Sequence, residues 1–266
     1  MDFDNLMYDL ELSLKKGHPS QRLDSNPVAV GLVEKRISAE QGLSILGQYT
    51  LLPARIVEIL CAMAFVLRDW TVVHEELLDN VAQECGSRTK GVSHYSILRN
   101  CAHREFGINI GTVQPIEVTG SFLNGIVHAI HNRSKEFVAG MAYALEDSAL
   151  PELEIVAEII NRVWTGLGRG GRLISRHETQ ERSYAVEILS VREPKLYSLE
   201  DFFVVHLLAI EHDHKNGLRS TIRNHVATDA AAEEVRAGFE FVLDTMDKWW
   251  NDLAESPAGA PQPSHA

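Results

Sequence analysis

Histidines and carboxylates are concentrated in one short stretch in the last third of the sequence. Between residues 202 and 214 the chain is mostly apolar, yet it holds three histidines and two acids, which are His206, Glu211, His212, Asp213 and His214. Burying such groups is costly unless a partner compensates their polar atoms. Histidine with carboxylate suits divalent zinc, iron, manganese or copper, and Glu211 and His214 would share one face of a helix. The stretch therefore predicts a metal site, and the alternative is a helix whose polar residues face water.

Further carboxylates and imidazoles lie on other predicted helices. Glu84 ends one long helix and His94 begins the next, while Glu146 ends a run of small and apolar residues where helices could pack closely. A buried carboxylate of this kind requires a cation or several hydrogen-bond donors. With the 206–214 cluster, these residues supply about six ligands from four helices, which is roughly the inventory of a dinuclear carboxylate site in a helix bundle.

The elements that must position these residues are helical. Apolar residues recur with a period near 3.6 along most of the chain, so we expect an all-α protein. Ser38 and Gln41 fit a capping box at a helix start. The segment 168–198 is the least regular, with 185–191 as the only strand-like run. Helices are expected over 2–16, 27–36, from 38, 53–84 (continuous, kinked or split), 94–106, 121–131, 134–150, 151–167, 199–215, 217–226 and 229–253.

The domain organisation follows from the absence of repeats and of a clear boundary. We expect one domain over residues 1–254, with a metal-binding core at about 50–220. Residues 255–266 are rich in Pro, Ala and Ser, which predicts a disordered tail.

The composition is that of an ordinary globular protein with an acidic balance. The 266 residues are 45% hydrophobic and 23% charged, with a formal net charge of −12. Nucleic acids and anionic membranes require clustered Lys and Arg, so we expect neither as a partner. The three cysteines are odd in number and lack a Cys-x-x-Cys arrangement, which fits a reducing cytoplasm. The acidic start is not a signal peptide, and the longest apolar run, 59–67, is too short to cross a bilayer.

The order of the candidate ligands resembles the haem-oxygenase-like diiron oxidases and oxygenases. The matching residues are Asn80 with Glu84, His94 with Tyr95 and Leu98, Tyr143 to Glu146, Phe203 with His206, and Glu211 with His214. The resemblance covers about residues 50–220 and implies a haem-oxygenase-like helical bundle. It also implies that two Fe(II) ions are bound by Glu84, His94, Glu146, His206, Glu211 and His214.

The last ligand group departs from the pattern of that family. The spacing is His206-x4-Glu211-x2-His214, one residue longer than the expected His-x3-Asp-x2-His, and the acid is Glu. On a regular helix His206 and Glu211 would diverge by roughly 140°, and a single π-type bulge would absorb the extra residue. The rival ligand is Asp213, seven residues after His206 and nearly eclipsed with it. That register would leave Glu211 outside the site.

The resemblance implies O2-dependent oxidation of a small molecule. Two irons with mixed His and Glu ligands can activate O2 for hydrogen removal from an unactivated carbon or for oxygenation of an amine, with electrons from an external donor. The chain is most similar to family members that desaturate isoleucine or valine and close an azetidine ring in antibiotic biosynthesis. We therefore expect an aliphatic L-amino acid substrate and an unidentified reductant, and we leave open whether the chain forms a homodimer.

Three residues outside the ligand set are candidates for binding the substrate. His74 is close enough in sequence to Glu84 to line a pocket, and Arg172 or Arg176 in the irregular segment could pair with a substrate carboxylate in a bidentate manner. These arginines could equally be solvated.

Four other functions remain open from the sequence. An N-oxygenase or a C–C-cleaving oxidase of the same fold would keep all the ligands and differ only in the pocket. A thiaminase-like helical enzyme would need a nucleophilic cysteine near the cavity, and Cys85 beside Glu84 keeps that alternative open. A metal-free helical interaction protein would leave Glu84, Glu146 and His214 without a reason to converge.

Overall fold

The structure, a computed structural model, describes residues 3–107, 109–168 and 182–256, and only the backbone of residues 211–213. No strand occurs in these residues, so the expected all-α class is confirmed. The helices are α1 (Phe3–Gly17), α2 (Pro27–Val33), α3 (Ala39–Tyr49), α4 (Leu51–Val66), α5 (Thr71–Glu84), α6 (His94–Phe106), α7 (Glu117–Asn132), α8 (Lys135–Gly166), α9 (Arg182–Val191), α10 (Leu199–Val205), α11 (Glu211–Ile222) and α12 (Asp229–Glu255).

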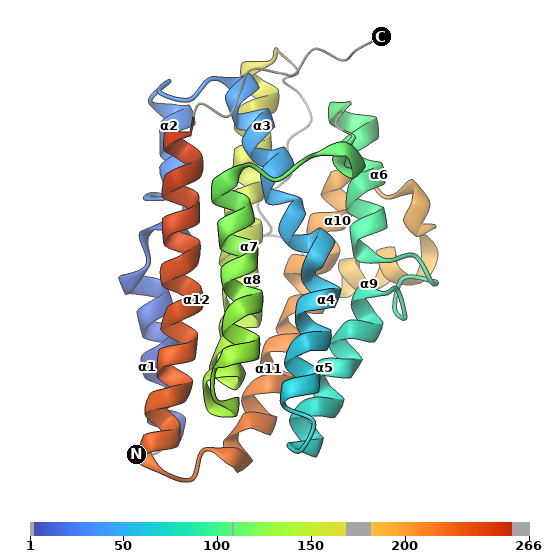
Figure 1. The fold of residues 1–266 in the computed structure, drawn as a ribbon. Coiled ribbons are helices and arrows are strands. Elements are labelled where there is room, and N and C mark those ends of the chain that lie inside the picture. Colours follow the sequence, from blue (N-terminus) through green and yellow to red (C-terminus); the bar gives the residue numbers. More distant parts are fainter. Residues whose placement is uncertain (1–2, 108, 169–181, 257–266) are drawn as a thin grey trace.

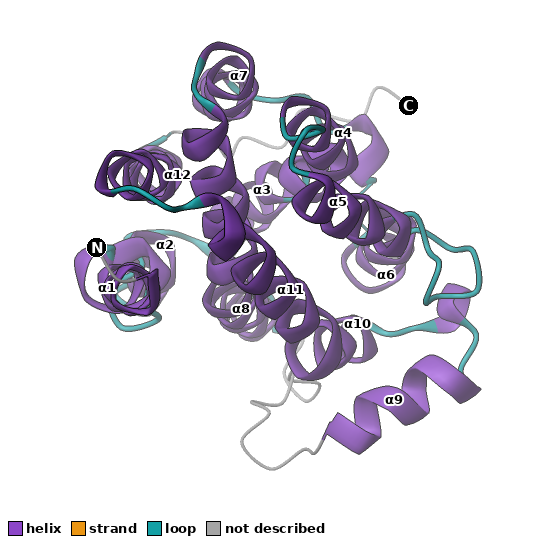
Figure 2. Cartoon of the chain, turned by 90° about the horizontal axis from the view of Figure 1, so that it is seen from below, coloured by secondary structure: helices purple, strands orange, loops and turns teal. Residues whose placement is uncertain are grey.

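The helix α8 is the centre of the bundle (Figures 1 and 2). It packs against α2, α3, α4, α11 and α12, and most of its residues from Phe137 to Ser148 are buried. Two glycines allow α8 and α12 to approach closely. A Cβ on Gly140 would clash with the carbonyl oxygen of Val235, and a Cβ on Gly238 would clash with that of Phe137. Backbone therefore packs directly on backbone where these two helices cross.

Two predicted helices are in fact one. We expected 134–150 and 151–167 to be separate because proline normally begins a helix. The structure has a single helix, α8, with Pro151 inside it. Buried residues on both sides of the proline, such as Tyr143 and Ile159, pack into the same core, and this burial outweighs the one backbone hydrogen bond that proline removes.

Other boundaries also differ from the expectation. The predicted helical stretch 53–84 is split into α4 and α5 by a turn at residues 67–70, which is one of the forms left open for it. The predicted helix at 121–131 begins earlier than expected, at Glu117. The interpretation of residues 185–191 as strand-like is wrong, because they belong to the helix α9. This helix buries Ala185 and Ile188, which are three residues apart, as on one face of a helix. The capping box at Ser38 and Gln41 is confirmed, with both hydrogen bonds present.

The helix predicted over 199–215 contains the expected bulge. After α10, the residues His206–Ile210 form a π-helical segment, η5, before α11 begins at Glu211. A π-helix inserts one extra residue into the helical turn. The bulge that the ligand spacing predicted is therefore confirmed. The segment expected over 217–226 lies in the second half of α11 and in a short 3-10 turn, Arg223–His225.

One helical stretch in the described part of the chain, Ala39–Val66, is long and apolar enough to cross a membrane by length and composition alone. In the bundle its two helices, α3 and α4, pack against α5, α7 and α8. The expectation of no membrane partner stays a prediction. At the other end of the chain, α12 continues to Glu255, one residue into the predicted tail, and residues 257–266 lie outside the described residues.

Candidate metal centre

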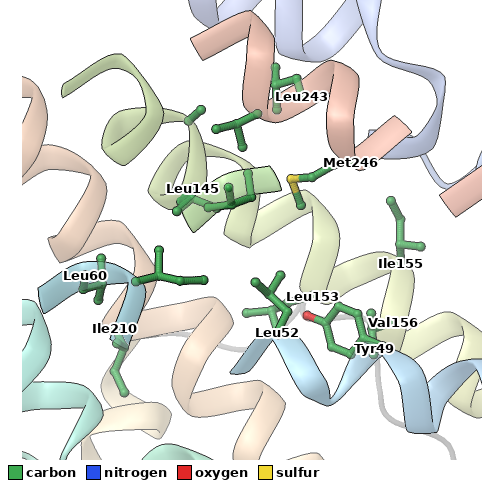
Figure 3. Close-up of a cluster of buried hydrophobic side chains, with 14 of the residues drawn as sticks. Tyr49, Leu52, Leu60, Leu145, Leu153, Ile155, Val156, Ile210, Leu243 and Met246 are labelled. Carbon is green, nitrogen blue, oxygen red and sulfur yellow. The ribbon is translucent and has the colours of Figure 1, made fainter. Parts of the chain in front are cut away.

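A cavity of about 110 Å³ lies among α3, α4, α5, α6, α8, α10, η5 and α11. Its apolar wall is formed largely by α4 and α8, and Figure 3 shows Leu52, Tyr49 and Leu153 of this wall close together. Five of the predicted metal ligands line the same cavity. The full lining is Tyr49, Leu52, Pro53, Ile56, Leu60, Glu84, His94, Tyr95, Leu145, Glu146, Ala149, Glu152, Leu153, Phe202, His206 and His214.

Glu84, His94 and His206 form a chain of close contacts. Nδ1 of His94 lies 3.0 Å from Oε1 of Glu84 and 3.2 Å from Nε2 of His206. Burial alone would raise the pKa of Glu84, but the charge and the hydrogen bond of His94 outweigh burial and lower it to about 2. Glu84 is therefore an ionised carboxylate that faces imidazole nitrogens.

The hydrogen bonds of His206 fix which ring nitrogen is free to act as a ligand. Nδ1 lies 2.7 Å from the carbonyl oxygen of Phe202, which can only accept, so Nδ1 carries the proton. Burial, together with the charge of His94, lowers the pKa of His206 to about 3. The ring is therefore neutral, and its Nε2, which faces Nδ1 of His94 at 3.2 Å, carries the lone pair. Metal-binding histidines are commonly oriented by a backbone carbonyl in this way.

Glu146 and His214 form a second pair on α8 and α11. Oε2 of Glu146 lies 3.4 Å from Nδ1 of His214, and its Oε1 accepts a hydrogen bond of 3.1 Å from Asn80. The amide nitrogen of Gln83 donates to Asp79, so the amide oxygen of Gln83 accepts from Nε2 of His214 at 3.0 Å. With its proton on Nε2, His214 turns Nδ1 toward a carboxylate oxygen. Such a contact requires a cation between the two atoms, either a proton or a metal.

The residue types fit a metal centre, although the candidate ligand atoms lie in direct non-covalent contact with one another. Among the side chains that the structure describes, no three His, Cys, Asp or Glu residues form a group that could hold a metal ion directly. Adjacent ligands at about 2.1 Å from a metal lie about 3 Å apart, which matches the contacts of His94. In addition, Nε2 of His94 is buried without a hydrogen-bond partner. The side chains of Glu211 and Asp213 lie outside the described residues, so the choice between them stays open.

Of the residues proposed for substrate binding, only His74 lies among the described residues. His74 is absent from the lining, because it precedes Glu84 by about 15 Å along α5 and its Nδ1 contacts the carbonyl oxygen of Ala64, where α4 turns into α5. Whether His74 contacts the substrate stays a prediction. Arg172 and Arg176 lie outside the described residues.

The cysteines do not support a nucleophilic site. Cys61 and Cys85 are exposed, Cys101 is buried with its pKa raised by burial to about 12, and none of the three lines the cavity. A thiaminase-like chemistry needs a thiolate next to the substrate.

Sequence reasoning missed one acidic residue in the cavity wall, Glu152. The signal was present, because Leu145, Ala149 and Glu152 are spaced as one face of a helix, and all three line the cavity. The assumed break at Pro151 separated Glu152 from that face. Sequence reasoning also assigned no role to Gln83, which orients His214.

The molecule is thus an all-α bundle that gathers histidines and carboxylates around one buried cavity. The chain belongs to the family described as "Domain of Unknown Function with solved-structure structure (DUF3865)", whose profile matches residues 4–167 and 185–256.

Two crystal structures of a CADD-like protein of unknown function from Nostoc punctiforme PCC 73102 share the fold. The structure at 2.00 Å resolution has a TM-score of 0.78 and 24% sequence identity, and covers 95% of this chain and 97% of its own. The structure at 1.35 Å resolution has a TM-score of 0.76 and 24% identity, with 95% and 94% covered. No curated protein matches the chain.

Proposed function

We propose that this protein is a non-haem diiron oxidase or oxygenase of haem-oxygenase-like fold, which oxidises a small molecule with O2 and electrons from an external donor. The observation that carries this proposal is the cavity itself, which is lined by Glu84, His94, Glu146, His206 and His214 from separate helices. With the acid of α11, Glu211 or Asp213, these residues would hold two Fe(II) ions. Such a pair of ions supplies O2 activation and hydrogen removal from carbon.

The protein's own residues would position the ligands and keep water out. The carbonyl of Phe202 keeps the proton of His206 on Nδ1, and the amide of Gln83 keeps that of His214 on Nε2. Asn80 holds the carboxylate of Glu146 at the cavity. Fixed tautomers and fixed carboxylates reduce the rearrangement that accompanies metal binding, which supports a role as ligands.

For the substrate we propose an aliphatic L-amino acid such as isoleucine or valine, with ring closure to an azetidine as the reaction. The lining supports an aliphatic group, because α4 and α8 present side chains such as Leu52, Ile56, Leu60, Leu145 and Leu153. The cavity of about 110 Å³ is smaller than the roughly 300–1,000 Å³ of typical ligand pockets, which favours a substrate of few atoms. N-oxygenation and C–C cleavage would use the same ligands, and product analysis by mass spectrometry separates these reactions.

Anaerobic titration with Fe(II), followed by a pulse of O2, tests the metal centre. We expect about two irons per chain, and O2 consumption that depends on a reductant and rises with isoleucine or valine. Glu84→Gln removes one anionic ligand and should lower iron uptake by about one ion per chain. Glu75→Gln, an exposed position on the same helix, is the matched control.

Equal iron uptake by wild-type protein and Glu84→Gln would exclude this site. No uptake by the wild-type protein would favour the metal-free interaction protein instead.

A further inference from the structure

Glu152 is a buried carboxyl group for which the described part of the chain supplies no charge partner. Its side chain is 4% exposed, and its Oε1 has no hydrogen-bond partner. Among the described residues, no Lys, Arg or His forms an ion pair with it. Against the effect of burial, the indole of Trp250 lowers the pKa of Glu152 slightly, but Nε1 of Trp250 has no hydrogen-bond partner among the described residues. Burying a carboxyl group in this way costs free energy, which a structural role does not recover.

The surroundings of Glu152 belong to the same cavity as the candidate metal ligands. Glu152 lines the cavity together with Tyr49, Leu145, Ala149 and Leu153, and no Lys or Arg is among the described lining residues. Burial raises the pKa of Glu152 to about 8, and Trp250 offsets only part of this effect. At neutral pH Glu152 is therefore mostly protonated, and none of the described residues around it supplies a cation.

We propose that Glu152 binds the ammonium group of the substrate, so that the cavity takes a primary aliphatic amine, either a simple amine or the α-amine of an amino acid. An ammonium group supplies both features that Glu152 lacks, a positive charge and N–H donors. The apolar lining then contacts the aliphatic part of the same molecule.

The spacing along α8 places such a molecule across the proposed metal centre. Glu146 and Glu152 are six residues apart, or about 9 Å along the helix axis. Because both side chains line one cavity, an amine bound at Glu152 would have its aliphatic carbons in the space between Glu152 and Glu146. The oxidation of the bound amine rests on the proposed function. Binding of the amine does not, because it requires Glu152 and not the metal ions.

Ligand binding measured by calorimetry, with and without Fe(II) under anaerobic conditions, tests the inference. The probes are pentylamine, norleucine, and pentanoic acid as an analogue that has a carboxylate in place of the amine. We expect at least one of the two amines to bind. Pentanoic acid should bind at least tenfold more weakly than that amine. The variant Glu152→Gln should bind the amine at least tenfold more weakly than the wild type. Glu154→Gln, an exposed neighbour on α8, should bind as the wild type does.

Two further readouts distinguish binding from a structural role. Ammonium binding at pH 7 should displace the proton of Glu152, which is seen as proton release in buffers of different ionisation enthalpy. Because Glu152→Gln removes an unpaired buried carboxyl group, it should unfold at the same or a higher temperature than the wild type. A lower unfolding temperature together with undiminished amine binding would show that Glu152 is structural and overturn the inference.

The two proposals fail in different ways. Amine binding that depends on Glu152 without any iron uptake would contradict the diiron function and leave this inference standing. Iron uptake and O2 consumption with amine binding that is unchanged in Glu152→Gln would overturn the inference and leave the diiron function standing. Tight binding of norleucine but not of pentylamine would identify the source of the amine as an amino acid.

Discussion

His18 joins the end of α1 to the middle of α12 through both nitrogens of its ring. Nδ1 lies 3.0 Å from Oδ2 of Asp247, and Nε2 lies 2.9 Å from Oε2 of Glu240. Burial alone would lower the pKa of His18, but the hydrogen bonds and charges of Asp247 and Glu240 outweigh it and raise the pKa above the ordinary imidazole value. The charged ring therefore stabilises the folded state.

The stability that His18 contributes should fall as the pH rises. A raised pKa gives its full stabilisation below the unfolded value of about 6.5 and loses it as the pH passes through the folded value. We expect His18→Gln to lower the free energy of unfolding by about 1–3 kcal/mol at pH 5.5, and by clearly less at pH 9. Urea unfolding at both pH values measures this, with His103→Gln, an exposed histidine, as the control. An equal loss at both pH values would contradict a charged His18.

At the scale of the helices, the close packing of α8 on α12 requires glycine at the point where they cross. Gly238→Ala would place a Cβ against the carbonyl oxygen of Phe137, which is backbone and cannot rotate away. We expect a loss of about 2–4 kcal/mol in unfolding free energy, as in other overpacked cores.

Gly125→Ala on α7 is the matched control, because nothing lies within 4 Å of its Cβ. This substitution should stabilise the protein by up to about 1 kcal/mol through helix propensity. Thermal unfolding of the two variants would show shifts of opposite sign. A stable Gly238→Ala would mean that α8 and α12 are farther apart than described.

Helices with a local signal could be predicted from the sequence, and those set by tertiary packing could not. The capping box of α3 and the π-helical segment followed from Ser38, Gln41 and the ligand spacing. The continuity of α8 through Pro151 and the helical state of α9 depend on burial against other helices, which no local pattern encodes. Likewise, the ligand types of the site were predictable, whereas Glu152 became visible only when α8 was continuous.

At the scale of the whole molecule, the candidate centre exists only when the bundle has formed. Its residues lie between Glu84 and His214, and they come from helices that are far apart in sequence. Metal binding should therefore stabilise the entire fold, because the unfolded chain cannot bring these ligands together.

We expect Fe(II) at about 100 times its dissociation constant to add about 2.7 kcal/mol to the unfolding free energy. For a chain of this size the unfolding temperature should rise by roughly 5–10 °C. Anaerobic differential scanning calorimetry measures the shift. Glu146→Gln should reduce it, and Glu154→Gln should not. A shift of the same size in Glu146→Gln would place the bound iron elsewhere.

Pro151 removes one helical hydrogen bond from α8 beside the cavity. Because proline has no N–H, the carbonyl of Asp147 loses its usual helical partner, and α8 is weakened between Glu146 and Glu152. Backbone amides around this point can therefore open and exchange with deuterium without unfolding of the bundle. The two carboxyl groups that line the cavity from α8, Glu146 and Glu152, lie on opposite sides of this missing hydrogen bond, so any bend of α8 at this point would change the distance between them.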